Sequence, residues 1–357
     1  MIVRDEHDVL DRCLRCARQF ADEIVVLDTG STDDSREIAL RYTPRVYDYV
    51  WTDDFAAARN AAYAYATCDY IMWLDADDVV PPASIDELIR LKSRLRDEDV
   101  VMLPYHTAFD RSGKPSFTFW RERITRRAAG FFWTDPVHEV IVPRGNIVRV
   151  NAPIEHRKAH VRTSERNLDI YRRLIESGKP LTPRQVFYYG CELYYHGYDA
   201  EAICTLERAR RDPATHGDNR LQACVHLSEL YARRGNPALA RAVLEPGLFY
   251  ASMPSAEALC RLGDLDRLDG YYARAELWYR AAMLHAQSPA DGIGFSKLDC
   301  ATYLPLINLG VCRYYRGDLA EAISCTRRAL ELCPDHPTAL ANLRCYLAAA
   351  PQTDPET

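Results

Sequence analysis

The chain has 357 residues, of which 48% are hydrophobic and 27% charged, so it is long enough for about two domains of an ordinary globular protein. Its formal net charge of −6 argues against a nucleic-acid partner, because such proteins usually concentrate basic residues to neutralise phosphates. No apolar run reaches the roughly 18 residues of a transmembrane span, and the opening MIVRDEHDVL has no signal-peptide core, so we expect a cytoplasmic location.

Short apolar runs alternate with helical patterns over the first 165 or so residues. The runs EIVVLD, RVYDYV, YIMWLD and DVVMLPY predict strands, and segments such as DVLDRCLRCARQF and SIDELIRLKSRL predict helices. This alternation is typical of an α/β sheet covered by helices. The first helix holds Cys13 and Cys16, the one C-x-x-C pair among 12 cysteines. We expect these thiols to be reduced and packed, because no second pair with zinc-ligand spacing follows.

Acidic residues gather where the predicted strands end. Glu6 follows the first run, Asp28 ends the second, and Asp75, Asp77 and Asp78 crowd together after YIMWL. In an α/β sheet, ligands bind beyond the carboxyl ends of the strands. Crowded carboxylates repel one another, and a divalent cation such as Mg²⁺ or Mn²⁺ would hold them and bridge to a phosphate. A helix N-cap is the alternative role for the three acids.

Four sequence blocks carry a resemblance to a known family. They are MIVRDE, DTGSTDDS, FAAARNAA and WLDADD, in that order. In order and spacing they resemble the blocks of family-two glycosyltransferases with the GT-A fold, and in particular the bacterial peptide and protein glycosyltransferases of the sublancin type. The resemblance covers roughly residues 1–165 and implies an α/β, Rossmann-like sheet that binds a nucleotide sugar.

The resemblance implies a metal site at the WLDADD block. Asp77 would be the direct ligand of Mg²⁺ or Mn²⁺, Asp75 would contact the ribose or a metal-bound water, and Asp78 would face solvent. His156, in IEHRKAHVRTSERNL, would complete the site as a third ligand. The alternative for His156 is an ordinary hydrogen-bonding residue at a domain junction.

The resemblance also implies a donor site. Asp28 would accept a hydrogen bond from the N3–H of uracil, and Arg4 and Glu6 would line the end of the first strand. Arg59 would lie near the base or the diphosphate, since a guanidinium is the natural partner of that charge. Arg123 would contact a phosphate or the acceptor. The alternatives are an Asx-turn for Asp28 and a surface position for Arg59.

Sugar transfer needs a base that removes the proton of the acceptor. The segment TFWRERITRRAAGFFWTDPVHEVI parallels the V-H-E block of the family, which makes Glu139 the candidate base, with His138 beside it. Asp135 is the second candidate. The alternative is that Glu139 lies in an edge strand formed by VHEVIV.

The second half of the chain repeats itself. Four glycines are each followed five positions later by alanine and twelve positions later by a small residue: Gly197, Gly235, Gly270 and Gly317. Glycine permits the turn between two antiparallel helices, and small residues let those helices approach closely. The pattern resembles the tetratricopeptide repeat, an all-α solenoid. We expect a glycosyltransferase domain over residues 1–178, the repeats over 179–350 and a disordered tail over 351–357.

Together these features predict a metal-dependent, inverting glycosyltransferase. Its donor would be a UDP-sugar, UDP-glucose or UDP-N-acetylglucosamine, and its acceptor a peptide or protein. The repeats would present the acceptor or form a homodimer. Two alternatives remain: an acceptor that is a cell-envelope glycan or lipid-linked, and a repeat scaffold whose transferase domain is degenerate.

Overall fold

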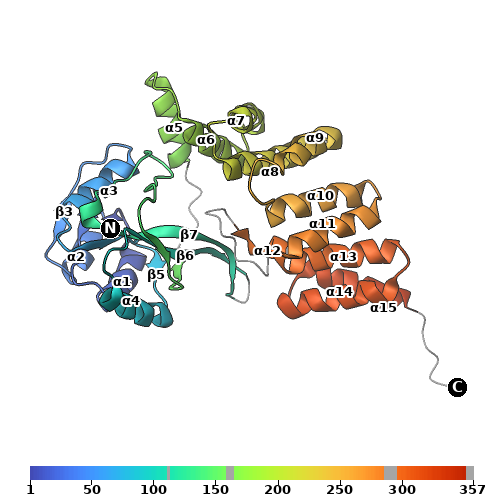
Figure 1. Ribbon diagram of the computed structural model, residues 1–357, viewed down its shortest axis with the longest axis horizontal. Helices are drawn as coiled ribbons and strands as arrows, with labels where there is room; N and C mark the ends of the chain where they lie inside the picture. The colour runs from blue at the N-terminus through green and yellow to red at the C-terminus, as the bar shows by residue number, and fades with distance from the viewer. Residues whose placement is uncertain (111–112, 158–164, 285–295, 351–357) are drawn as a thin grey trace. The chain divides into compact units, whose positions relative to one another are not determined.

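The computed structural model describes residues 1–110, 113–157, 165–284 and 296–350 (Figure 1). The chain divides into two compact units, Met1–Ala108 with Thr118–Pro180, and Phe109–Phe117 with Leu181–Thr357. The sequence-based boundary at 178 lies two residues before this division, and it gave residues 109–117 to the first domain. The tail predicted over residues 351–357 lies outside the described residues.

The first unit begins with a parallel sheet. Strands β1 (Ile2–Val3), β2 (Val26–Asp28) and β3 (Val46–Asp48) pair in that order. Helices α1 (His7–Ala17), α2 (Ser35–Leu40) and α3 (Phe55–Ala64) alternate with them. The apolar residues of the predicted strands form the core, since Val26 and Leu27 are almost fully buried. The predicted α/β fold class is confirmed.

A second sheet carries the acidic turn. Its strands are β4 (Tyr70–Met72), β5 (Asp78–Val79), β6 (Val100–Phe109), β7 (Pro115–Arg126), β8 (Ile147–Arg149) and β9 (Ile154–His156). The order is β7-β6-β9-β5, with β4 on β7 and β8 on β6. Helix α4 (Pro82–Arg94), a 3-10 turn (Arg127–Ala129) and α5 (Arg166–Glu176) complete the unit. The antiparallel register of β5 and β9 pairs Asp78 with His156, residues far apart in sequence.

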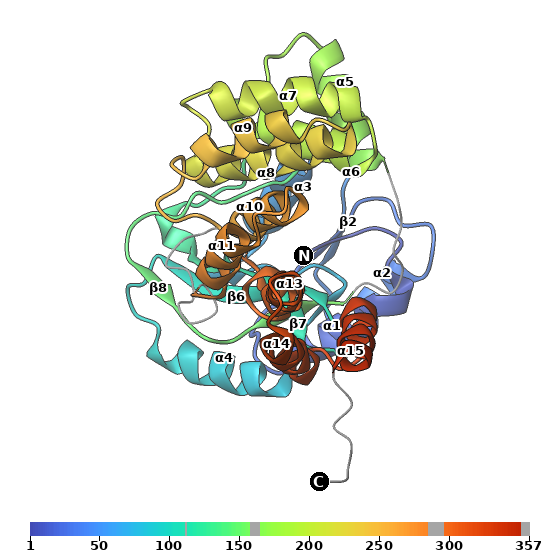
Figure 2. The ribbon, with the colours of Figure 1, turned by 90° about the vertical axis from the view of Figure 1, so that its right-hand side faces the viewer.

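The second unit is built from helix pairs. The paired helices are α6 (Pro183–Tyr195) with α7 (Asp199–Arg211), α8 (Gly217–Arg233) with α9 (Pro237–Gly247), α10 (Ala256–Leu268) with α11 (Tyr272–Leu284), and α13 (Tyr303–Tyr315) with α14 (Leu319–Leu332). The short elements β10 (Ser296–Lys297) and α12 (Leu298–Ala301) precede the fourth pair, and α15 (Pro337–Ala349) follows it. Figure 2 shows α13 and α14 nearly end-on, beside each other.

The glycine register has the structural role that the sequence predicted. All four turn glycines have a left-handed backbone, with φ values between 73° and 82°. The small residues five and twelve positions later are fully or almost fully buried between paired helices. Gly190, seven residues before Gly197, packs against Leu206 in the same way as Gly263 packs against Tyr279. The predicted all-α repeat architecture is therefore confirmed.

We expect Gly263→Ala to lower the free energy of unfolding by about 1–3 kcal/mol, the usual effect of overpacking a core. An added Cβ would lie 2.6 Å from the ring of Tyr279, which is fully buried and cannot swing away. Urea unfolding followed by circular dichroism measures the change. An unchanged midpoint would show that α10 and α11 can separate without cost.

Candidate active site

Hydrogen bonds to its own backbone N–H and C=O groups hold the WLDADD turn, between β4 and β5, in one conformation. The N–H of Asp75 donates to Oδ2 of Asp78 (3.0 Å), and the N–H of Asp78 donates to the carbonyl of Asp75 (3.1 Å). The buried thiol of Cys13 donates to that same carbonyl (3.2 Å). Cys13 thus packs beneath the turn as a free thiol, as the sequence predicted. The turn is a fixed loop, in which the carboxylates have defined directions.

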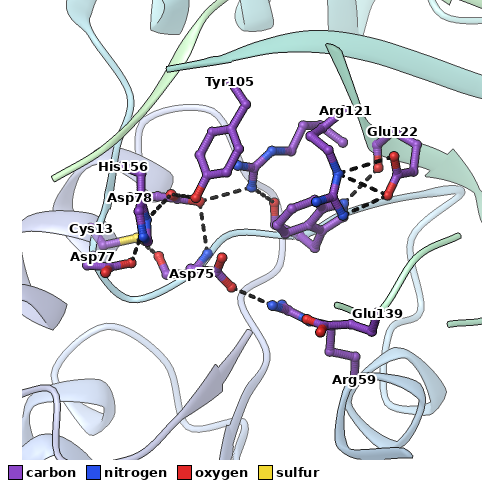
Figure 3. A network of polar contacts seen from close by, with 12 residues as sticks. Cys13, Arg59, Asp75, Asp77, Asp78, Tyr105, Arg121, Glu122, Glu139 and His156 are labelled. Atoms are coloured by element: carbon purple, nitrogen blue, oxygen red, sulfur yellow. Dashed lines mark hydrogen bonds and ion pairs between the residues drawn. The ribbon is translucent and has the colours of Figure 1, made fainter. Parts of the chain in front are cut away.

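Asp78 does not face solvent, so this sequence-based expectation was wrong. Its side chain is fully buried, because β5 begins at Asp78 and pairs with β9 in the interior. Nη1 of Arg123 donates to its Oδ2 (2.9 Å). The hydroxyl of Tyr105 donates to its Oδ1 (2.9 Å) (Figure 3). Burial, and then the charge of Asp78, raises the pKa of Tyr105. Asp78 is an anchor of the turn.

Arg123 also lies elsewhere than predicted. Its side chain is fully buried, with the guanidinium 3.6 Å from the ring centre of Trp73 and 4.0 Å from that of Tyr105. A direct contact with a phosphate or acceptor needs an exposed guanidinium, and Arg123 offers none. Its charge instead compensates Asp78 in the interior.

Asp77 and His156 meet across the turn. Nδ1 of His156 lies 3.0 Å from Oδ1 of Asp77 and 3.5 Å from Oδ1 of Asp78. Burial opposes protonation of His156, but the two carboxylates outweigh it and raise its pKa to about 9. His156 belongs to β9, whose pairing with β5 brings it to the turn. The neighbouring His160 and Arg162 lie outside the described residues.

The side chains around the turn fit a divalent cation. Asp75, Asp78 and His156 each offer one ligand atom, and these atoms lie within 4.8 Å of one another. Carboxylate oxygens with one imidazole nitrogen suit Mn²⁺ or Mg²⁺. Both oxygens of Asp78 already accept hydrogen bonds, whereas the side chains of Asp75 and Asp77 are 28% and 18% exposed. The residues whose ligand atoms meet are therefore Asp75, Asp78 and His156, and the accessible Asp77 lies beside them, with its Oδ1 3.0 Å from Nδ1 of His156.

Arg59 joins the turn to the candidate base. Its Nη2 donates to Oδ1 of Asp75 (2.7 Å), and its Nε donates to Oε1 of Glu139 (2.7 Å) (Figure 3). The guanidinium lies 5.1 Å and 4.9 Å from the ring centres of Trp73 and Trp133. Burial opposes both charges, yet the ion pairs raise the pKa of Arg59 and hold that of Asp75 well below its usual range. The surface alternative for Arg59 is wrong, because the residue is only 7% exposed.

A short loop positions Glu139. Its ends are joined by an isolated bridge, in which Thr134 and Val140 exchange backbone hydrogen bonds of 2.9 Å and 3.0 Å. Asn60, next to Arg59 on α3, donates to the carbonyl of Trp133 (2.9 Å) and accepts from its N–H (2.8 Å). Glu139 thus lies in a loop and not in the edge strand that the alternative required.

The second candidate base, Asp135, lies in the same loop and has a strained backbone conformation. Asp135 has φ 69° and His138 has φ 54°, values that non-glycine residues rarely adopt. The N–H of Phe55, at the start of α3, donates to the carbonyl of Pro136 (2.9 Å) between them. Such strained positions persist where the surrounding structure fixes them, and they cluster at functional sites.

The remaining predicted donor residues lie at the ends of β1 and β2. Oδ1 of Asp28 accepts from the N–H groups of Gly30 (3.2 Å) and Ser31 (2.9 Å), so the Asx-turn alternative is present in the structure. Arg4 is exposed, and Glu6 is the N-cap residue that precedes α1. Burial lowers the pKa of Arg166 of α5, while Glu139 and Glu6 raise it and Arg4 lowers it, so Arg4 and Glu6 lie in the electrostatic surroundings of the same arginine as Glu139. The part of Arg4, Glu6 and Asp28 in donor binding stays a prediction.

Two site residues, Arg121 and Glu122, were missed by the sequence reasoning. Arg121 lies over Trp73 (4.9 Å to the ring centre), and its Nη2 donates to Oε1 of Glu122 (3.0 Å). Burial opposes the charge of Arg121, but Glu122 and then Glu139 raise its pKa. The sequence could have indicated Arg121, because residues two apart on a strand share a face and Arg123 was already a candidate. Arg121 and Arg123 on β7 therefore meet the same tryptophan.

Comparison with known proteins gives two family matches. Residues 1–152 match the glycosyl transferase family 2 profile, and residues 304–336 match the tetratricopeptide repeat profile. The chain is 29% identical over 344 residues to a TPR repeat-containing protein of Synechococcus elongatus, covering 94% of this chain and 75% of that one. It is 26% identical over 255 residues to the SPbeta prophage-derived glycosyltransferase SunS of Bacillus subtilis, covering 66% of this chain and 58% of that one.

One solved structure is similar to part of this chain. The TPR protein YrrB, described as having an unusual peptide-binding site, matches with a TM-score of 0.37 and 21% identity, over 50% of this chain and 83% of that one. Among the helices in the described ranges, none is long and apolar enough to cross a membrane.

Proposed function

We propose that this protein, a glycosyltransferase whose residues 1–152 form a family 2 domain, transfers a sugar from a UDP-sugar to a peptide or protein, with inversion and with Mg²⁺ or Mn²⁺. One observation carries the proposal. A single buried arginine, Arg59, holds the acid of the WLDADD turn and the candidate base at 2.7 Å each. The carboxylates of Asp75 and Glu139 are thereby fixed relative to each other, as a displacement reaction would require.

The accessible carboxylates and the imidazole of the turn would hold the metal ion. When bound, the ion supplies positive charge against the departing diphosphate. Asp75 and His156 of the cluster would provide an oxygen and a nitrogen ligand, and the accessible Asp77 beside His156 a further oxygen, while the buried Asp78 keeps the turn in place. A metal ligand must be unprotonated, so binding would displace the proton that His156 holds beside Asp77.

Glu139 would take the proton from the acceptor. Its carboxylate is 14% exposed at the side chain and lies on a loop fixed at both ends. The proton moves from the acceptor hydroxyl to the carboxylate as the new glycosidic bond forms and the bond to the diphosphate breaks. Arg59 orients that carboxylate through Oε1.

The tetratricopeptide region would recruit the acceptor. Such solenoids present extended surfaces to polypeptide partners, and the sequence blocks of the first half resemble those of peptide-directed transferases. Mass spectrometry of matched peptide, glycan and lipid-linked acceptors distinguishes the alternatives. Transfer to a glycan or lipid-linked acceptor in preference to peptides would refute a peptide or protein acceptor.

We expect UDP to raise the melting temperature of the protein in the presence of Mn²⁺ and much less in its absence. A ligand that binds the folded state stabilises it by about 2.7 kcal/mol at 100 times its dissociation constant. Thermal shift with UDP, GDP and ADP, each with Mn²⁺ or EDTA, measures the effect. A metal-independent shift would refute the metal, and an equal shift with all three nucleotides would refute the UDP-sugar donor.

Asp77→Asn is the variant to compare with the wild-type protein in these thermal shift measurements. The substitution removes a charge from an accessible ligand and one partly exposed ion pair, with His156, so the fold should be retained and the Mn²⁺-dependent shift lost. Retention of the full shift would show that Asp77 does not hold the metal.

A further inference from the structure

Three guanidinium groups surround the ring of Trp73, the first residue of the WLDADD block. Those of Arg59, Arg121 and Arg123 lie 5.1, 4.9 and 3.6 Å from the ring centre. Their side chains are 9%, 22% and 0% exposed, in the same order. Arg59 and Arg123 each hold an acid of the turn. Arg121 is therefore the most accessible of the three, and it holds no acid of the turn.

Glu122 fixes Arg121 through one edge of the guanidinium. Nε of Arg121 lies 3.3 Å from both carboxylate oxygens of Glu122, and Nη2 donates to Oε1 (3.0 Å) (Figure 3). Glu122 is 2% exposed, and its carbonyl accepts from Nε1 of Trp73 (2.7 Å). Arg121 thus has a fixed direction and a compensated charge. Among the contacts between described residues, Nη1, on the opposite edge of the guanidinium, has no partner.

This guanidinium lies beside the candidate base. Burial lowers the pKa of Arg121, while Glu122 and then Glu139 raise it above its usual value. Trp73 also packs edge to face against Trp133 (5.2 Å between ring centres), where the loop of Glu139 begins. In a displacement, the reacting sugar carbon lies between the leaving diphosphate and the attacking acceptor, and the base lies next to that acceptor. A sugar held between the turn and Glu139 would therefore lie next to Arg121.

We propose that Arg121 binds the transferred sugar, with Nη1 donating a hydrogen bond to one of its hydroxyl oxygens. The assignment rests on the proposed function and names the part of the donor that the metal and the nucleotide pocket do not hold. Because Glu122 already compensates the charge, the remaining donor suits a neutral oxygen, so the sugar is a neutral one. A sugar without that hydroxyl would leave the donor unpaired in a site closed to water, which selects against it.

A purely structural role for Arg121 makes a different prediction. If the guanidinium served only to compensate Glu122, its loss would weaken the fold, and UDP and UDP-sugars would be affected alike. A residue that touches the sugar affects the UDP-sugar alone. Replacing both members of a buried pair is often neutral for stability, so Arg121→Gln combined with Glu122→Gln should remain folded.

The test is isothermal titration of this double variant with UDP, UDP-glucose and UDP-N-acetylglucosamine in the presence of Mn²⁺. We expect UDP to bind as in the wild-type protein and the UDP-sugar to bind about 10- to 100-fold more weakly, the usual contribution of a hydrogen bond from a charged donor. Arg149→Gln is the matched control, since that guanidinium lies 5.4 Å from the ring of Trp120 on the same strand β7. It should bind every ligand as the wild-type protein does.

The outcomes separate this assignment from the proposed function. Failure of the wild-type protein to bind either UDP-sugar would refute the proposed donor, and the assignment with it. Wild-type binding that the double variant retains in full, or a loss that is equal for UDP and UDP-sugar, would overturn the assignment of Arg121 alone.

Deoxy donors identify the contacted oxygen. Four derivatives of the UDP-sugar that the wild-type protein binds, lacking the substituent at C2, C3, C4 or C6, are titrated into both proteins. We expect one of them to bind the wild-type protein about 10- to 100-fold more weakly and to cost the double variant nothing further, because the two changes remove the same hydrogen bond. Equal losses in the two proteins for all four derivatives would show that Arg121 contacts no hydroxyl of the sugar.

Discussion

Glu139→Gln is expected to slow transfer to a hydroxyl acceptor by about 100- to 10,000-fold, the usual contribution of a general base. The amide has the shape of the carboxylate but cannot take up the acceptor proton. Its oxygen can still accept the hydrogen bond of Arg59, whose second ion pair with Asp75 at 2.7 Å is untouched. Binding of UDP should therefore remain nearly unchanged. Steady-state transfer with isothermal titration of UDP measures both quantities.

Matched acceptors sharpen this test. A cysteine thiol is partly ionised near neutral pH and needs a base less than a serine hydroxyl does. Glu139→Gln should therefore slow a cysteine peptide less than a serine peptide, and raising the pH should partly restore the cysteine rate. Asp135→Asn is the control from the same loop. Wild-type rates of Glu139→Gln on the serine peptide would exclude Glu139, and a loss in Asp135→Asn alone would make Asp135 the base.

The repeat region shows what sequence alone can predict. Glycines such as Gly270 are required by a left-handed turn, and small residues such as Ala275 by a close helix contact. Both requirements are local and recur at similar spacings, so they leave a readable pattern. The glycosyltransferase blocks were equally readable, because ligand-binding residues follow strand ends in a fixed order.

The acidic turn shows why the sequence could not predict which of its charged side chains are buried. Asp75, Asp77 and Asp78 are chemically identical in the sequence, and only the pairing of β5 with β9 decides which one is buried. The partner that compensates Asp78 is Arg123, 45 residues away. The local sequence does not show this pairing, so Arg123 was predicted as a contact with a phosphate or the acceptor. Burial of a charge depends on long-range pairing, which a local pattern does not encode.

The link between Arg59 and Glu139 is a second long-range feature. The two residues are 80 positions apart and their side chains meet at 2.7 Å. The sequence named both as site residues from separate blocks but gave no sign that they touch. The adjacent Asn60 accounts for the meeting, because it fixes the backbone of Trp133 at the entrance to the loop of Glu139.

The second large effect is expected at Asp78, where Asp78→Asn should destabilise the protein by about 3–5 kcal/mol, the usual cost of removing one partner from a buried ion pair. Asp78 and Arg123 are both fully buried and joined at 2.9 Å, so the substitution leaves the guanidinium charge in the interior without compensation. Asp77→Asn, one residue away, removes the charge of an 18% exposed side chain and its ion pair with the partly exposed His156, and should cost only about 1 kcal/mol or less.

Chemical unfolding of the two variants without added metal or nucleotide measures this contrast. The absence of ligand matters, because bound nucleotide would stabilise each folded variant according to its own affinity. A double variant in which Asp78 and Arg123 both become apolar should recover much of the loss, since replacing a whole buried pair by apolar residues is often neutral. Equal stability of Asp78→Asn and Asp77→Asn would show that the Arg123 charge is compensated by another group, and Asp78 would then return to the set of possible metal ligands.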